Sequence, residues 1–179
     1  TDVCLKRKIR NYVELAREGE AGYNILIKAD KALNTKFTEA YEELGLKTGQ
    51  KGKNANDVAA AQKYICDNYF DVRAFGAVMS TGNDPCGIVR GPVQLAFAKS
   101  VDPVYPQDIT ITRQAKTTEE RQEVGSTEMG KKSIISYGLY RAEGYVSAML
   151  AQKVTGFSED DLELLWNAVL NMFEHDRSA

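Results

Sequence analysis

The sequence predicts an α+β domain in which helices pack on one face of an antiparallel sheet. Helical periodicity governs residues 2–68 and 158–175, whereas the segment between them is dominated by extended, β-forming stretches. This order of helices, strands and a final helix differs from the regular alternation that produces a parallel α/β sheet. With 179 residues, of which 43% are hydrophobic and 27% charged, the chain is long enough to bury its own core.

The first predicted helix covers residues 2–17. Its apolar residues recur at helical spacing: Leu5, Ile9, Tyr12, Val13 and Ala16. On the remaining surface Lys6 and Arg10 are four residues apart and share a face, with Arg7 beside them. Such a face could lie along a chain of phosphates, or it could be an ordinary solvated helix surface.

Two more helices are predicted before the strands begin. Residues 29–44 carry an apolar stripe that stops at Gly45, and residues 57–68 carry another. The polar, glycine-containing stretch between them reads as a loop.

Extended structure is predicted from residue 69 onward. Residues 69–79 are rich in β-formers, residues 93–98 resume as a strand after a Gly/Pro loop, and residues 109–112 alternate cleanly. Residues 133–149 suggest a long or broken strand. The last helix spans residues 158–175 and begins with a Ser-x-x-acid signature.

Residues 113–133 form a polar, charged excursion between two strand-like segments. Its length far exceeds the usual hairpin loop of about 2–5 residues. Loops this long in compact domains are usually functional or disordered, and both readings apply here.

The net charge of −2 conceals a strong segregation of charge. Residues 158–176 contain six carboxylates and no Lys or Arg, and Arg177 follows, so residues 1–157 sum to +3. An acidic helix on one face therefore leaves room for a basic surface on another.

Other classes of function find little support. No apolar run approaches the roughly 20 residues needed to cross a bilayer, and three widely spaced cysteines suggest neither disulfides nor metal, as expected in the cytoplasm. We expect no cofactor, since the phosphate-cradle, zinc-protease and hydrolase motifs are absent. The single histidine, His175, could be a general base or a favourable cation near a helix C-terminus.

Several ungapped blocks carry a resemblance to a known family. They are TDVCLKRKIRNYV, FDVRAFGAVMSTGNDPCGIVRGPVQLAFAKSVDPVYPQDITITR, GSTEMGKKSIISYGLYRAEGYVSA and LLWNAVLNMFEHDRSA. Together they resemble the backbone subunit of the type I-C CRISPR surveillance complex, Cascade, from the Cas-seven family in its Csd-two branch. Relative to that family, the chain looks truncated at both ends.

The resemblance implies a modified RRM-like (ferredoxin-like) palm with an antiparallel sheet, a helical fingers insertion and a β-hairpin thumb. Within a single domain, the palm would comprise residues 1–19 and 69–179, the fingers 20–68, and the thumb 113–132 within the palm.

The implied function is to hold a CRISPR guide RNA by its backbone for pairing with invader DNA, without enzymatic activity. The implied partners are the guide RNA, the target DNA strand through the guide, copies of the same chain in a helical filament, and other Cascade subunits. The implied RNA-binding residues are Thr1, Lys6, Arg7, Arg10, Arg73, Arg90, Gln94, Arg113, Met129, Lys131 and Lys132. Met129 matches the thumb-base position at which an apolar side chain wedges against bases.

Two alternatives remain. Type III relatives cut RNA with an acidic loop residue, and Asp30, Asp71 or Asp84 could serve such a metal-dependent reaction. The chain could also be a protein-interaction module with an incidental basic helix.

Overall fold

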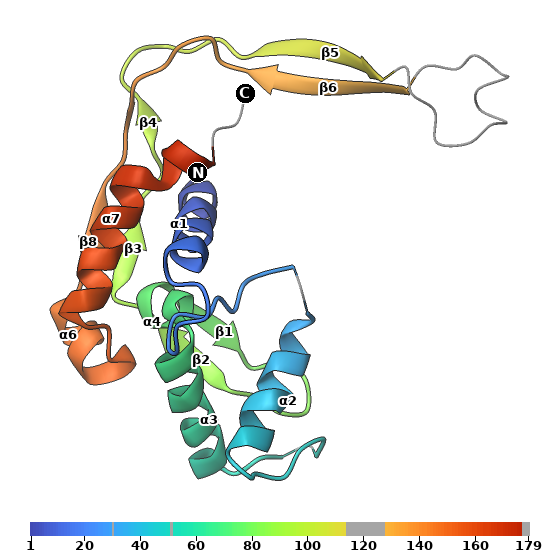
Figure 1. Cartoon of the computed structure of the whole chain (residues 1–179), viewed down its shortest axis with the longest axis vertical. Helices are drawn as coiled ribbons and strands as arrows, with labels where there is room; N and C mark the ends of the chain where they lie inside the picture. The colour runs from blue at the N-terminus through green and yellow to red at the C-terminus, as the bar shows by residue number, and fades with distance from the viewer. Residues whose placement is uncertain (30, 51, 114–127, 177–179) are drawn as a thin grey trace, which may run out of the picture. The chain divides into compact units, whose positions relative to one another are not determined.

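The computed structural model describes residues 1–29, 31–50, 52–113 and 128–176. The chain divides into two compact units, the first made of residues 1–97 and 143–177 and the second built on residues 98–142. Figure 1 shows the order of the elements along the chain.

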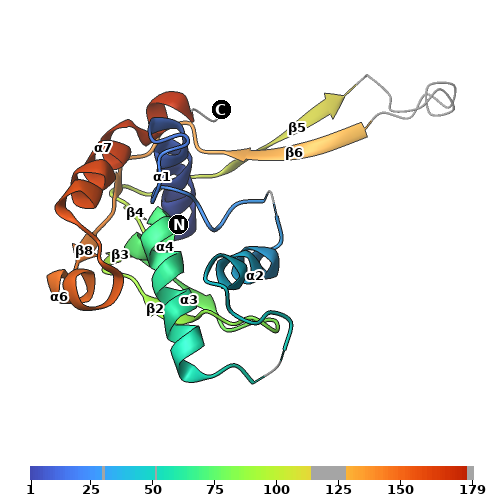
Figure 2. The same ribbon diagram turned by 60° about the horizontal axis from the view of Figure 1, so that its bottom comes forward.

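The first core of unit 1 lies between the two longest helices. Helices α1 (Asp2–Ala16) and α7 (Glu159–His175) lie side by side in Figures 1 and 2. Their buried apolar side chains form one cluster with residues of the intervening segments: Ile9, Val13, Ile25, Phe70, Ala74, Phe75, Val93, Ala151, Phe157, Leu164, Leu165, Ala168 and Met172. The Lys8 ammonium fastens the two helices at one end, since it bonds the Asp176 carbonyl at 2.7 Å.

The second core joins the other helices of unit 1 to a hairpin. Helices α2 (Leu33–Glu43) and α3 (Ala55–Asn68) pack with strands β1 (Gly76–Met79) and β2 (Gly87–Arg90), which are antiparallel. Its buried residues are Leu26, Phe37, Ala40, Tyr41, Ala61, Ile65, Cys66, Val72, Met79, Cys86 and Val89. Asn54 caps α3 by accepting from the Asp57 amide at 2.8 Å.

The short helix α4 (Phe70–Phe75) lies between these cores, and here the predicted strand over residues 69–79 is wrong for its first half. The sequence Phe-Asp-Val-Arg-Ala reads as alternating apolar and polar residues, which normally indicates a half-buried strand. That interpretation assumes that the polar residues face water. In the structure all six residues of α4 are buried, because Asp71 and Arg73 find partners inside the protein.

The other elements of unit 1 agree better with those predicted from the sequence. Strand β3 (Val93–Leu95) pairs with β8 (Gly144–Val146), and α6 (Ala148–Leu150) runs into the π-helical turn η1 (Ala151–Thr155). The predicted start of α7 is confirmed as a reciprocal capping box, in which Asp161 N donates to Ser158 Oγ at 3.1 Å and Ser158 N donates to Asp161 Oδ2 at 2.9 Å.

Unit 2 consists of two antiparallel ladders. Strand β4 (Lys99–Ser100) pairs with β7 (Tyr140–Arg141), and β5 (Gln107–Arg113) pairs with β6 (Glu128–Ile134) over seven residues each. The predicted strand at residues 109–112 is confirmed within β5, and the long or broken strand predicted at 133–149 is a broken one, divided among the end of β6, β7 and β8. The polar excursion is partly strand, since β6 already begins at Glu128, and residues 114–127 lie outside the described part.

Helices and antiparallel strands together confirm the α+β class. The expectation of one continuous sheet does not hold for the described residues, whose strands form four separate two-stranded ladders. The predicted palm, fingers and thumb, with their RRM-like sheet, stay predictions; residues 1–19 and 20–68 fall in the same compact unit.

Candidate nucleic-acid interface

The predicted basic face of α1 is formed by two cations above one aromatic ring. Lys6 Nζ lies 5.7 Å, and Arg10 Cζ 5.3 Å, from the centroid of the Phe75 ring. The ring belongs to α4 and is 8% exposed. Cation–π attraction therefore favours the placement of both side chains over the Phe75 ring.

Arg10 is held in addition by a buried acid. Its Nε donates to Asp71 Oδ2 at 2.8 Å, and Asp71 is completely buried. The same carboxylate accepts from the Leu26 amide at 2.8 Å and from the Ile27 amide at 3.0 Å. Three donors satisfy this buried charge, as a carboxylate without water requires.

The other candidates on α1 are held less firmly. Lys6 Nζ bonds Asp2 Oδ2 at 3.2 Å, and this hydrogen bond lowers the pKa of the Asp2 carboxyl. Arg7 is exposed and has no hydrogen bond or ion pair with the described residues. Thr1 occupies the N-cap position and is exposed, but its side chain caps no amide.

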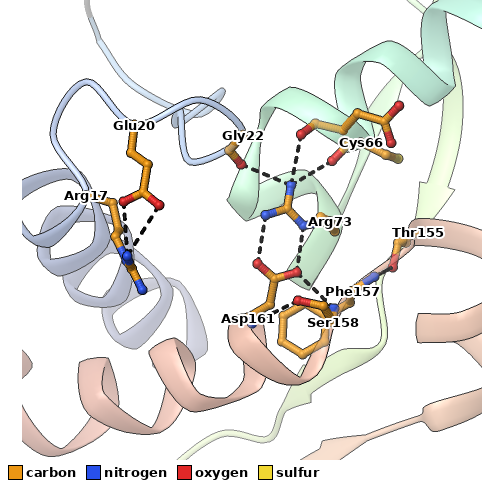
Figure 3. A network of polar contacts seen from close by, with 10 residues as sticks. Arg17, Glu20, Gly22, Cys66, Arg73, Thr155, Phe157, Ser158 and Asp161 are labelled. Atoms are coloured by element: carbon orange, nitrogen blue, oxygen red, sulfur yellow. Dashed lines mark hydrogen bonds and ion pairs between the residues drawn. The ribbon is translucent and has the colours of Figure 1, made fainter.

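The position of Arg73 does not fit the predicted contact with the guide. The residue is only 7% exposed, and its guanidinium forms a bidentate pair with Asp161 at 2.8 and 2.7 Å. The remaining Nη1 donates to the carbonyls of Gly22, Cys66 and Asp67 at 3.0, 2.9 and 3.2 Å. Figure 3 shows this guanidinium enclosed by α3, α7 and the turn after α1. Arg73 therefore joins elements of unit 1, and its guanidinium is buried among these partners instead of being offered to a phosphate.

Arg90 and Gln94 lie on exposed positions of the short ladders. Arg90 is opposite Gly76 in the β1–β2 pair, and Gln94 is opposite Tyr145 in the β3–β8 pair. Gly91 between them meets the end of α4 so closely that an added Cβ would lie 2.2 Å from the Phe75 carbonyl carbon. Glycine is required at this crossing.

The hairpin of unit 2 places its candidates on opposite faces. Met129 and Lys131 lie on one face, opposite Thr112 and Thr110, and Met129 is 73% exposed. Lys132 lies on the other face, opposite Ile109. The side chain of Arg113 lies outside the described part, although its backbone closes the ladder opposite Glu128.

The acids considered for metal-dependent cleavage are engaged internally where they are described. Asp71 binds the Arg10 guanidinium, and Asp84 accepts from Thr38 Oγ1 and the Gly49 amide and pairs with Lys53 at 3.0 Å. Burial raises the pKa of Asp84, but these hydrogen bonds outweigh it, and the pKa lies below its ordinary value. Asp30 and the side chain of His175 lie outside the described part.

The described residues show neither a metal cluster nor a helix that could span a membrane. Within the described ranges, no three His, Cys, Asp or Glu side chains gather in a way that could hold a metal ion. No helix of the described chain is long and apolar enough to cross a membrane.

Sequence reasoning missed Asp71 and Phe75 as supports of the basic face. The only signal available was their spacing, four residues apart, which matches the spacing of Lys6 and Arg10 on α1. That match becomes meaningful only once residues 70–75 are known to be helical.

Comparison with known proteins identifies one family over the whole chain. The family model described as CRISPR-associated protein Cas7 matches residues 1–179. No curated protein matches the chain. Among solved structures, a chain of a "CRISPR RNA-guided surveillance complex, pre-nicking" is similar at 16% identity and a TM-score of 0.48, over 93% of this chain and 57% of that one.

Proposed function

Since the chain belongs to the Cas7 family of CRISPR-associated proteins, we propose that it binds CRISPR guide RNA as a backbone subunit of a Cascade-type complex. The resemblance in sequence favours the type I-C, Csd-two branch. In this proposal copies of the chain follow one guide in the cytoplasm as a helical filament, together with other Cascade subunits, and leave recognition of the invader DNA to the guide.

The observation that carries this proposal is the pair of cations above Phe75. Lys6 and Arg10 lie on the same helix face, and Arg10 donates only through Nε to the described residues. The two terminal nitrogens of its guanidinium remain able to donate to phosphate oxygens. Arg7, exposed on the same helix, adds a third cation.

Binding through phosphates suits a guide holder because it is independent of sequence. Contacts to phosphates position a nucleic acid without reading its bases. A few contacts for each copy suffice when neighbouring copies share one RNA, because each further contact is then made at a high effective concentration.

The hairpin of unit 2 is proposed to act as the thumb. Met129 is a large apolar side chain on a two-stranded ladder, exposed beside Lys131 on the same strand. A two-stranded hairpin by itself is only marginally stable in water. Packing of Met129 against unstacked bases would therefore stabilise the hairpin and cover the exposed faces of the bases.

The test is a titration of the protein with fluorescent guide RNAs that carry unrelated spacers. We expect the double substitution Lys6→Ala with Arg10→Ala to weaken binding of all spacers equally, by about 100-fold at low salt. Arg17→Ala is the matched control, because Arg17 lies past the other end of α1 and pairs with Glu20 at 3.0 Å. Strong dependence on the spacer, or an equal loss in both variants, would contradict the proposal.

The same complexes test the absence of enzymatic activity. They are incubated with complementary RNA and Mg²⁺ or Mn²⁺ and analysed on a denaturing gel. We expect intact RNA; periodic cleavage products would instead support the relationship to the RNA-cutting type III subunits.

A further inference from the structure

We propose that Asp71 and Phe75 of α4 are positioning residues that orient Arg10 toward a guide phosphate. This inference rests on the proposed function. It assigns to α4 an indirect role in RNA binding, which acts through Arg10.

The spacing of the paired residues is the same on α1 and on α4. Lys6 and Arg10 are one helical turn apart on α1, and Asp71 and Phe75 are one turn apart on α4. Arg10 contacts both members of the α4 pair, since its Nε donates to Asp71 and its Cζ lies 5.3 Å from the centroid of the Phe75 ring. Lys6 shares the Phe75 ring.

Only one of the three guanidinium nitrogens of Arg10 bonds Asp71. Asp71 accepts from Nε alone, so the end-on fork formed by the two terminal nitrogens makes no hydrogen bond to the described residues. Bidentate binding of phosphate requires such a fixed, planar fork, which a lysine cannot supply. A side chain that is already ordered loses less conformational entropy when RNA binds.

Asp71 is itself held in place by the backbone. The backbone amides of Leu26 and Ile27 hold its two oxygens, and the residue is fully buried at the start of α4. The carboxylate therefore cannot follow Arg10 if the arginine moves. Asp71 acts as a fixed point that connects the segment at residues 26–27 to the basic face of α1.

An alternative effect of Asp71 has the opposite sign. A carboxylate near a phosphate site weakens the local positive potential, so its removal alone would strengthen RNA binding. Asp71→Asn separates the two effects: it removes the negative charge and also the second acceptor on which Arg10 and Ile27 both depend. Positioning predicts a loss of affinity, and charge alone predicts a gain.

The experiment is a double-mutant cycle measured by anisotropy with a fluorescent guide RNA. We expect Asp71→Asn to weaken binding roughly fivefold, as for a side chain that must be ordered on binding, and to have no effect in the Arg10→Ala background. An equal loss in both backgrounds would mean that Asp71 acts only on the fold, and a gain or no change would overturn the proposal.

Two further variants keep the test decisive if Asp71→Asn folds poorly. Arg10→Lys keeps the charge but not the fork, and we expect roughly a threefold loss of affinity with an unchanged salt dependence. Phe75→Leu removes the ring that Lys6 and Arg10 share, and we expect it to weaken binding more when Arg10 is present than in the Arg10→Ala background. Arg10→Lys binding as tightly as the wild type would overturn the role of positioning.

The outcomes also separate this inference from the proposed function. If Arg10→Ala itself leaves RNA binding unchanged, the proposed interface on α1 is wrong. If Arg10→Ala weakens binding but Asp71→Asn and Arg10→Lys do not, the interface stands and only the positioning role fails.

Discussion

Arg73 and Arg10 are both paired with buried aspartates, yet they differ in what their guanidinium groups can still do. Arg73 directs donors to Asp161 and to three carbonyl oxygens of unit 1. Arg10 donates one hydrogen bond to Asp71, and its side chain is 15% exposed. An ion pair with a buried acid is therefore common to both arginines, and what distinguishes them is the number of internal acceptors and the exposure of the side chain.

The largest expected effect is on Arg73. We expect Arg73→Ala to lower the free energy of unfolding by about 3–5 kcal/mol, because Asp161 would remain buried without its partner. Urea denaturation followed by circular dichroism measures this loss. Arg90→Ala, on an exposed position, is the control and should change stability by less than about 0.5 kcal/mol. Equal midpoints for Arg73→Ala and wild type would contradict the structural role.

The pair of Lys53 and Asp84 gives a second structural case that pH can test. The pKa of Asp84 is lowered in the folded protein, so its contribution to stability is complete above pH about 4 and is lost as pH falls through the folded-state pKa. We expect urea midpoints to fall on acidification in this range, and to fall less in Asp84→Asn. Parallel pH profiles for the two proteins would show that Asp84 contributes nothing.

Substitution of Arg10 should reduce RNA binding more than stability, whereas substitution of Arg73 should reduce stability. We expect Arg10→Ala to weaken guide binding about tenfold, the loss typical of one charge-assisted contact. Its cost in stability should be smaller than that of Arg73→Ala, since Asp71 keeps two backbone donors. Binding and urea curves on the same preparations test both statements. A larger loss of stability for Arg10→Ala than for Arg73→Ala would invert the comparison.

The smallest expected effect is a change in the alkylation rate of the Cys66 thiol, which should distinguish the substitution of Arg73 from that of Arg10. Burial raises the pKa of the Cys66 thiol to about 11, and its carbonyl accepts from Arg73. We expect iodoacetamide at pH 8 to modify the exposed Cys4 quickly and Cys66 slowly in the wild type and in Arg10→Ala. Cys66 should react faster only in Arg73→Ala, as measured by mass spectrometry. Equal protection in all three proteins would show that Arg73 does not hold this region closed.

The comparison also explains what the sequence could predict. The helices at residues 2–16 and 159–175 were predictable because their apolar residues face one core in a regular period. Helix α4 was not, because its two charged residues are as buried as its apolar ones, and alternation of polarity then carries no information about exposure.

The candidate site was predictable to the same extent. The spacing of Lys6 and Arg10 indicates their common face, which the structure confirms by placing both above Phe75. Nothing local distinguishes Arg73 from Arg10, because their partners, Asp161 and Asp71, are 88 and 61 residues away along the chain. Which arginine is internal is decided by tertiary packing.

The central claim is that Arg10 contacts a guide phosphate, and the salt dependence of binding tests it most directly. The logarithm of the affinity for single-stranded RNA falls linearly with the logarithm of the salt concentration, with a slope of about −0.7 for each phosphate contact. We expect Arg10→Ala to make that slope about 0.7 less negative, the amount expected for one contact, while Arg17→Ala leaves it unchanged. Identical slopes for Arg10→Ala and the wild type would contradict the account.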